Sequence, residues 1–345
     1  KNAAADLPFG GGKSGIVRPR HLNEKDHKSV IAGFGRLLKR YKAVYVPGPD
    51  VGTNDGDMKI FAIGNGLNKV VSKPVDMGGN RIDELGAAAR GVVVAYNALL
   101  EHLPRLEQLP QFKGIHIPDP AQRDILIQGF GAVGAHAARI FNQATKIPAP
   151  VIKGISDAGG FLLNPQGLDW QALFSQWKKS GRVTQEYFHD TMLHGPKSGT
   201  GSLVYSNHPD NLLRESAFCL VPASPVANYL DTDPLTRPSM TTDRMGQWHL
   251  IVEGANTYSP DPTRKANRRR MERRVFRDMG ILIATDYLVN SGGVIYAAHE
   301  RIIPTPDHLL IPAEILGDSQ AIEQWLEKHR EEFALLAEDR RKAAE

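Results

Sequence analysis

The sequence contains very little cysteine and no long apolar run. Cys219 is the only cysteine among 345 residues, so an internal disulfide is excluded, and a reducing compartment fits this composition. No apolar stretch is long enough to span a bilayer, so we expect no membrane partner. Aromatic residues make up 7% and charged residues 23% of the chain, which is ordinary for a globular protein.

The chain also lacks a strong excess of either charge. The net charge of +4 is too small to predict nucleic-acid binding by itself. Residues 264–277 form a predicted basic helix with seven arginines and one lysine. Met271 and Val275 give this helix an apolar side, so a solvated basic face explains it better than nucleic-acid binding does.

The sequence starts at Lys1 rather than at methionine and shows no signal-peptide pattern. It also begins in the middle of a motif, so we expect the natural N-terminus to be missing. The expected location is cytoplasmic, or an organelle matrix if a targeting segment has been lost.

The first 16 residues contain two lysines and a run of glycines directly before the second lysine. Gly10–Gly12 precede Lys13, and glycine lets the backbone approach a ligand closely. A phosphate-binding P-loop would need glycine at position 7, where Leu7 stands. Two interpretations remain: Lys1 and Lys13 converge on the carboxylate of a substrate, or the segment is a turn with solvated lysines.

The next polar residue of interest follows a short predicted strand. A helix over 23–41 is followed by the predicted strand 43–46, and Asp50 comes just after it. An aspartate at the end of a strand is well placed for chemistry, because the sheet holds the loop rigidly. The alternative is an ordinary turn-forming or helix-capping aspartate. Further helices are predicted over 57–68 and 87–103.

A dinucleotide-binding pattern lies in the middle of the chain. The apolar strand 124–128 leads into a G-x-G-x-x-G motif and then a helix, the context in which this motif binds a pyrophosphate. The motif residues are Gly129, Phe130, Gly131, Ala132, Val133 and Gly134. Asp157 ends the next predicted strand, where an acidic residue contacts the adenosine ribose of NAD; a turn is the alternative. Ser156 beside it leaves room for the 2′-phosphate of NADP, so NADP remains an alternative cofactor.

Strands that alternate with helices predict an α/β protein with a doubly wound parallel sheet. Strands are expected over 151–156, 218–223, 249–252 and 280–284. We predict a partial catalytic domain over 1–108, a dinucleotide-binding domain over 109–288, and C-terminal helices over 289–345 that pack back on the first domain. Residues 197–209 are expected to form an exposed loop and residues 232–245 a surface insertion. No metal site is predicted.

Taken in order, the motifs resemble the glutamate/leucine/phenylalanine/valine dehydrogenase family. The matching segments are Lys-Asn with Pro-Phe-Gly-Gly-Gly-Lys, Pro-Asp-Val-Gly-Thr, Gly-Phe-Gly-Ala-Val-Gly, Glu-Gly-Ala-Asn and Asn-Ser-Gly-Gly-Val. They span residues 1 to about 300 in the family's order. The resemblance implies reversible oxidative deamination of an L-amino acid to its 2-oxo acid and ammonium, with NAD or NADP as cofactor and a lean to NAD.

The resemblance also implies roles for individual residues. Lys13 would polarise the 2-oxo group and the attacking water, and Asp50 would exchange protons with the amino group. Lys1 would hold the α-carboxylate of the substrate. The other implied substrate contacts are Gly11, Gly12, Asn290, Val294 and Ala297; the implied cofactor contacts beyond the glycine motif and Asp157 are Ala255, Asn256 and Asn290.

Two positions depart from the family's pattern. Ala88 replaces a threonine that contacts the nicotinamide amide, and Ala297 replaces a hydroxyl residue of glutamate-specific members. Ala297 favours an apolar substrate, whereas the lysine motifs favour glutamate, so the substrate stays open. A cofactor-binding but catalytically impaired or regulatory member is the alternative. The family further implies a homo-oligomer.

Overall fold

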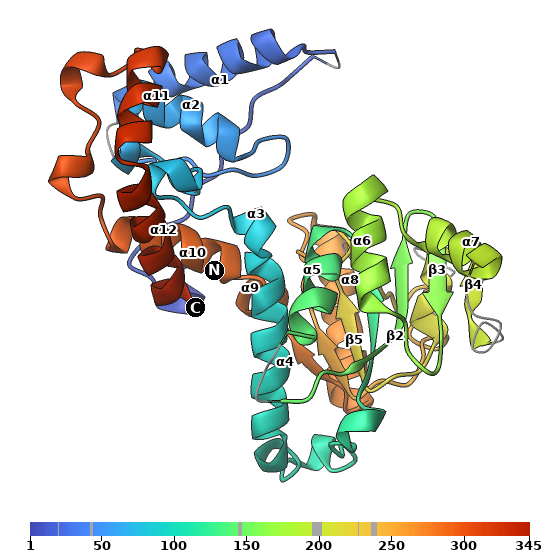
Figure 1. The fold of residues 1–345 in the computed structure, drawn as a ribbon. Coiled ribbons are helices and arrows are strands. Elements are labelled where there is room, and N and C mark those ends of the chain that lie inside the picture. Colours follow the sequence, from blue (N-terminus) through green and yellow to red (C-terminus); the bar gives the residue numbers. More distant parts are fainter. Residues whose placement is uncertain (20, 42–43, 144–146, 195–201, 227, 236–239) are drawn as a thin grey trace. The chain divides into compact units, whose positions relative to one another are not determined.

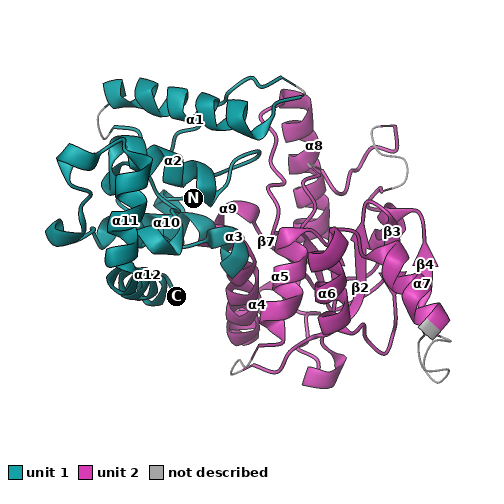
Figure 2. Ribbon diagram, turned by 45° about the horizontal axis from the view of Figure 1, so that its top comes forward, with its two compact units in different colours: residues 1–87, 293–345 teal, residues 88–292 magenta. Residues whose placement is uncertain are grey.

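The chain consists of two compact units. A computed structural model describes residues 1–345 except 20, 42–43, 144–146, 195–201, 227 and 236–239. Unit 1 comprises Lys1–Ala87 and Gly293–Glu345, and unit 2 comprises Ala88–Gly292 (Figure 2). The observed division lies between Ala87 and Ala88, one helix before the boundary predicted between residues 108 and 109, because helix α4 (Ala87–Leu106) packs in the core of unit 2.

Unit 1 is helical. Its helices are α1 (Glu24–Leu38), α2 (Asp55–Asn65), α3 (Ile82–Leu85), α10 (Gly292–Ile302), α11 (Ser319–Lys328) and α12 (Arg330–Ala344), with short 3-10 turns between them. The Asn23 side chain accepts a hydrogen bond from Asp26 N and caps α1, and Asn54 and Asp57 form a capping box on α2. The strand predicted over 43–46 is wrong for Val44–Val46, which have no regular structure; Ala43 lies outside the described residues.

The C-terminal helices share one core with the start of the chain. The apolar residues of α11 and α12 are buried together with those of α1 and α2, and they are Ile31, Met58, Phe61, Ile322, Leu326, Phe333 and Leu336. A buried ion pair joins the two segments as well, since Lys73 Nζ lies 2.7 Å from Glu300 Oε2 on α10. Segments more than 200 residues apart in sequence therefore form one unit.

Unit 2 is built on a seven-stranded sheet in the order β4-β3-β2-β1-β5-β6-β7. The strands are β1 (Asp124–Gln128), β2 (Val151–Asp157), β3 (Gly160–Leu163), β4 (Val204–Ser206), β5 (Cys219–Pro222), β6 (Leu250–Val252) and β7 (Leu282–Ala284). The pairs that link β2, β1, β5, β6 and β7 are parallel, as predicted, whereas β3 and β4 add an antiparallel edge.

Helices cover both faces of this sheet because its strands are apolar on both sides. The remaining helices are α5 (Ala132–Phe141), α6 (Trp170–Ser180), α7 (Thr184–His194), α8 (Pro262–Glu272), a π-helical segment Arg273–Asp278 and α9 (Asp286–Val289). Ile125 and Ile127 of β1 pack in the core with α4, α5 and α6, whereas Leu126 packs in the opposite core with Met271 of α8. Figure 1 shows α5 and α6 on the near side of the sheet and α8 behind it.

Two surface predictions need correction or qualification. Residues 232–245 are only partly a surface insertion, because Met240 and Thr241 are buried and Asp231 bridges to Thr241. The loop predicted over 197–209 contains strand β4, while residues 197–201 lie outside the described residues. Both segments place a few residues against the sheet, since Met240 packs in one core with Leu126 and Val204–Ser206 pair with β3.

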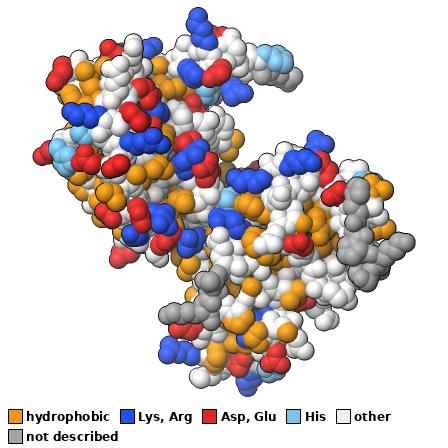
Figure 3. Space-filling model, in the orientation of Figure 1, with side chains coloured by type: hydrophobic (Ala, Val, Ile, Leu, Met, Phe, Trp, Pro, Cys, Tyr) orange, Lys and Arg blue, Asp and Glu red, His pale blue; other side chains and the backbone are white. Residues whose placement is uncertain are grey.

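Among the described residues, none of the helices is long and apolar enough to cross a bilayer. Basic and acidic side chains are interspersed over the face of unit 1 that is visible in Figure 3. On α8 and the π-helical segment after it, the apolar side predicted from Met271 and Val275 is buried, whereas Arg269 and Arg273 are exposed to solvent.

Candidate active site

The two residues expected to carry out the chemistry meet in unit 1. The amino group of Lys13 donates to the carboxylate of Asp50, although the two residues lie 37 positions apart in sequence. Both side chains remain accessible, with 82% of Lys13 and 54% of Asp50 exposed. The pair therefore places one cation and one carboxylate side by side at a surface that a small substrate can reach.

A tight turn fixes Asp50. Thr53 Oγ1 accepts a hydrogen bond from Asp50 N at 2.8 Å, and Thr53 N donates to Asp50 O at 2.9 Å. Gly52 has φ +78°, a conformation that glycine adopts without steric cost. Asn54 then caps α2 directly after the turn. The turn interpretation and the functional interpretation of Asp50 are therefore compatible.

Positive charge surrounds the Asp50 carboxylate. Its hydrogen bond with Lys13 is the main reason that the pKa of Asp50 lies below the ordinary value, against an opposing effect of partial burial. The Val51 backbone N–H, 2.9 Å from Oδ1, and the charges of Lys13 and Lys1 lower this pKa further. The charge of Lys1 therefore acts on the same carboxylate as that of Lys13, and it is the smaller of the two effects.

The glycines before Lys13 differ in what surrounds them. A Cβ added to Gly10 or Gly11 would meet no atom within 4 Å, whereas one on Gly12 would lie 3.2 Å from the ring of Tyr45. The backbone at Gly10 and Gly11 thus borders open space, and Gly12 packs on an aromatic ring. A ligand can approach this backbone closely because no side chain intervenes.

Val294 and Ala297 lie three positions apart on α10 and are partly buried. Glu300, one turn further along this helix, is tied to Lys73 and accepts a hydrogen bond from Asn80 N at 2.8 Å. This buried anchor holds the helix that carries the two predicted substrate contacts. Burial lowers the pKa of Lys73, while the charge of Glu300 opposes that shift.

In unit 2, the three glycines of the dinucleotide motif have different surroundings. Gly129 has φ +93°, and a Cβ there would lie 2.6 Å from Ser224 N. A Cβ on Gly134 would lie 2.2 Å from Gly129 O, so the helix could not pack so closely on the strand. A Cβ on Gly131 would meet nothing within 4 Å, which leaves the backbone at the start of α5 open to a phosphate.

The ends of β6 and α9 meet beside this motif. Asn290 Nδ2 donates to Gly254 O at 3.2 Å and to Asn256 Oδ1 at 3.0 Å, and Ala255 N donates to Pro222 O at 2.9 Å. Asn290 is 6% exposed, and its Oδ1 has no hydrogen-bond partner among the described residues. A buried acceptor without a donor fits a ligand that supplies one, such as the amide of a nicotinamide.

A buried network of charged and polar side chains anchors the two residues that flank the 254–256 loop. Glu253 is fully buried, and its carboxylate contacts Arg268 Nη2 at 2.6 Å, Tyr229 Oη at 2.7 Å and Thr257 Oγ1 at 3.2 Å. Asp286 accepts a hydrogen bond from Thr257 N at 2.8 Å. The network fixes the residues on both sides of Gly254 and Asn256.

The carboxylate of Asp157 accepts four hydrogen bonds from other residues of the chain. Its Oδ1 accepts from Gly159 N and Thr184 Oγ1, and its Oδ2 accepts from Val183 N and Thr184 N, at 2.5–3.1 Å. These bonds match the turn alternative and also bind the first residue of α7. The ribose contact stays a prediction, and a ribose hydroxyl would have to compete with these four donors.

Sequence reasoning missed several polar residues that the fold gathers. The Glu-Gly-Ala-Asn motif includes Glu253, but nothing in the sequence connects this residue with Tyr229 or Arg268, because their contact depends on how α8 packs on the sheet. An acidic residue directly after an apolar strand was the one available signal. Ser72 and Asp83, which line a cavity in unit 1, carried no sequence signal.

The comparisons with known proteins agree with this arrangement. The model of the Glutamate/Leucine/Phenylalanine/Valine dehydrogenase family matches residues 78–302, and the model of the Glu/Leu/Phe/Val dehydrogenase dimerisation domain matches residues 1–63. The chain belongs to this family. The resemblance deduced from the sequence motifs is thereby confirmed.

Named relatives are glutamate dehydrogenases. The chain is 29% identical to the Thermotoga maritima glutamate dehydrogenase over 312 residues, covering 88% of this chain and 63% of that protein. It is also 29% identical to the catabolic NAD-specific glutamate dehydrogenase RocG of Bacillus subtilis, covering 88% of this chain and 61% of RocG. The chain thus spans about three-fifths of the length of these relatives.

Solved structures share the fold. The hetero-hexameric glutamate dehydrogenase of Thermus thermophilus aligns with a TM-score of 0.61 at 20% identity, covering 99% of this chain and 74% of that one. The Plasmodium falciparum glutamate dehydrogenase aligns with the same TM-score at 18% identity, covering 99% and 69%. The predicted α/β class with a largely parallel sheet is confirmed.

Proposed function

We propose that the chain catalyses the reversible oxidative deamination of an L-amino acid with NAD(P). In this reaction, amino acid, NAD(P)+ and water yield the 2-oxo acid, ammonium, NAD(P)H and a proton. The observation that carries the proposal is the contact between Lys13 and Asp50 beside an open glycine backbone. Membership of the family supports it.

Each unit contributes its own part of the chemistry. Lys1 binds the α-carboxylate, and Gly11 and Gly12 let the substrate lie against the backbone. Lys13 polarises the 2-oxo group and the attacking water, and Asp50 moves protons to and from the amino nitrogen. Val294 and Ala297 contact the substrate side chain from α10.

The residues of unit 2 fit a nicotinamide dinucleotide. The Gly129–Gly134 segment and the N-terminus of α5 would hold the pyrophosphate, Ala255 and Asn256 the nicotinamide ribose, and Asn290 the amide. When bound, the cofactor supplies the acceptor for the hydride from the substrate Cα. The protein's task is to orient it and to exclude water.

NAD and glutamate are the first cofactor and substrate to test. RocG is named as NAD-specific, and both named relatives act on glutamate by their names. The position of Ala297, whose methyl group cannot hydrogen-bond a side-chain carboxylate, favours leucine, phenylalanine or valine instead. We also propose a homo-oligomer, because part of the chain matches a dimerisation domain.

The test is a panel of L-amino acids with NAD+ and NADP+, read as formation of reduced cofactor. We expect turnover with at least one amino acid, lost in Lys13→Ala. Absence of turnover across the panel in wild-type protein that binds the cofactor would favour the second candidate, a regulatory member. Ala88, at the position of a family threonine, is the observation behind that candidate.

A further inference from the structure

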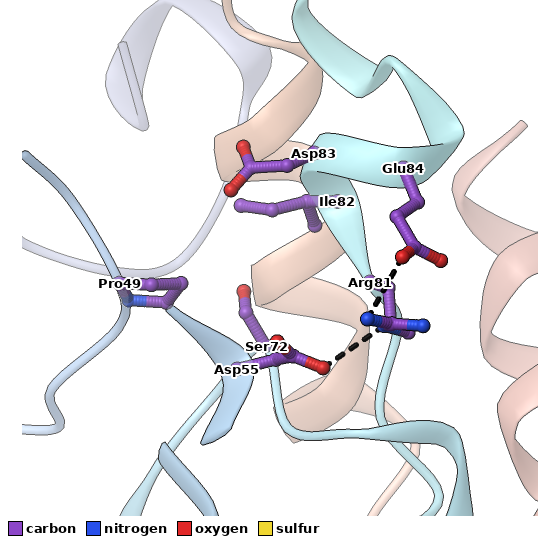
Figure 4. Close-up of a pocket in the computed structure, with 7 residues that line it drawn as sticks. All are labelled: Pro49, Asp55, Ser72, Arg81, Ile82, Asp83 and Glu84. Atoms are coloured by element: carbon purple, nitrogen blue, oxygen red, sulfur yellow. Dashed lines mark hydrogen bonds and ion pairs between the residues drawn. The ribbon is translucent and has the colours of Figure 1, made fainter. Parts of the chain in front are cut away.

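A small cavity in unit 1 adjoins the turn that carries Asp50. It encloses about 40 Å³, enough for a small ion or a water and far too little for an amino acid. Figure 4 shows the side chains that surround it, which are Pro49, Asp55, Ser72, Arg81, Ile82, Asp83 and Glu84. Pro49 directly precedes Asp50, so the cavity is next to the proposed proton-transfer residue.

The cavity carries more negative than positive charge. Its single basic residue, Arg81, is shared between Asp55 Oδ2 at 2.9 Å and Glu84 Oε1 at 2.8 Å. Asp83 has no ion-pair partner among the described residues. Partial burial first, then the charges of Asp55 and Asp50, raise the pKa of Asp83 above its ordinary value. An added cation would relieve this repulsion.

Ser72 supplies an independent sign of a missing ligand. The residue is 1% exposed, and its hydroxyl has no hydrogen-bond partner among the described residues. In Figure 4 this hydroxyl points into the space below Ile82 and Asp83. A buried hydroxyl without a partner is costly, so native proteins normally satisfy it with protein, water or a ligand.

We infer that this cavity binds one small monovalent cation and that its occupant is ammonium, the ion that the proposed reaction releases and consumes. The inference rests on the proposed function for the identity of the ion. Ammonium is a tetrahedral donor that can serve the Ser72 hydroxyl and the Asp83 carboxylate together. Sodium and potassium share its charge but donate no hydrogen bond. The site would hold ammonium beside Asp50, separate from the Lys13–Asp50 pair.

Binding is tested on the whole chain without amino acid or cofactor. The thermal midpoint is measured in ammonium chloride, potassium chloride and sodium chloride at equal ionic strength. We expect ammonium to raise the midpoint more than the other two salts. Asp83→Asn and Ser72→Gly should lose this difference; glycine removes the hydroxyl and suits the positive φ of +57° at this position. Asp339→Asn, on the exposed side of α12, is the matched control and should keep it.

A kinetic measurement in the direction of amination uses the same variants. Asp83→Asn should raise the KM for ammonium about tenfold, the effect of losing one charged hydrogen bond, while the KM for the 2-oxo acid stays unchanged. A variant that is merely misfolded would raise both constants or lower kcat alone.

The outcomes separate this inference from the proposed function. Equal midpoints in the three salts, or an ammonium effect that survives in Asp83→Asn and Ser72→Gly, would overturn the ammonium site even if the enzyme turns over. An equal response to potassium and ammonium would overturn ammonium as the occupant. An ammonium effect lost in both variants, in a protein without turnover, would support the site and refute the function.

Discussion

The buried ion pair between Arg268 and Glu253 allows a quantitative prediction about stability. Arg268 is 4% exposed and Glu253 is fully buried, with 2.6 Å between Nη2 and Oε1. Arg268→Met keeps an apolar stem of similar length but leaves the carboxylate without its cation. Breaking a buried pair from one side costs about 3–5 kcal/mol. Since Tyr229 and Thr257 still donate to Glu253, we expect the lower end of that range.

The loss should depend on pH. Burial raises the pKa of Glu253 above its ordinary value even though Arg268 opposes this shift. In Arg268→Met the pKa rises further, so the folded protein binds a proton that the unfolded chain releases. The destabilisation relative to wild type should therefore be small below the folded-state pKa of Glu253 in the wild type, grow as the pH rises above that pKa, and level off above the still higher pKa in the variant.

Urea unfolding followed by tryptophan fluorescence measures the effect. A loss of about 3 kcal/mol lowers the midpoint by about 1–1.5 M for a slope of about 2–3 kcal/mol/M. Arg269→Met, the exposed neighbour on α8, is the control and should stay within about 0.5 kcal/mol of wild type. The double variant Arg268→Met with Glu253→Gln, which removes the charge but keeps an acceptor for Tyr229 and Thr257, should recover most of the loss. If Arg268→Met were no less stable than Arg269→Met, the reasoning about this network would be refuted.

Three further predictions follow from single contacts. Gly134→Ala should cost about 1–3 kcal/mol, because its methyl group would lie 2.2 Å from Gly129 O, whereas Gly131→Ala should fold normally but bind NAD(P) more weakly in a fluorescence titration. Asp157→Asn should lower the thermal midpoint by weakening the cap on α7; an unchanged midpoint with a higher KM for NAD would instead indicate the ribose contact. Lys13→Ala should raise the pKa of Asp50 towards its ordinary value in an NMR titration, and no change would contradict the observed pairing.

The local patterns of the chain predicted most of the sheet. Strands β1, β2, β5, β6 and β7 are short apolar runs flanked by polar residues or glycine, so periodicity and composition identify them. Val44–Val46 have the same composition, but they pair with no strand among the described residues, and they remain irregular. Strand formation depends on a partner as well as on local preference.

The antiparallel edge strand β4 forms where the local sequence does not predict a strand. Strand β4 has only three residues, Val204–Ser206, and is preceded by a glycine- and serine-rich run, so nothing local distinguishes it from a loop. Pairing with β3 creates it. The sequence also could not locate the buried network, because Tyr229, Glu253 and Arg268 come from separate segments that meet only after α8 packs on the sheet.

For the candidate site, the motifs indicated which residues to consider, but not the hydrogen-bond partners that surround them. Lys13 and Asp50 are in contact, and the charge of Lys1 acts on the same carboxylate, while their roles towards a substrate stay a prediction. The four donors around Asp157 were not foreseeable, since three of its partner groups belong to Val183 and Thr184, far along the chain. The cavity at Ser72 was not predictable either, because only the folded chain shows that this buried hydroxyl has no hydrogen-bond partner among the described residues.

The most direct test of the proposed chemistry is the single-turnover rate of reduced-cofactor formation in wild type, Lys13→Ala, Asp50→Asn and the double variant. If the pair acts as one proton-transfer unit, each single change should slow the step by about 10²–10⁴-fold, and the double variant should be hardly slower than the slower single one. Retention of the wild-type rate in Lys13→Ala, with cofactor bound, would contradict the assignment of Lys13 and Asp50 as the catalytic pair.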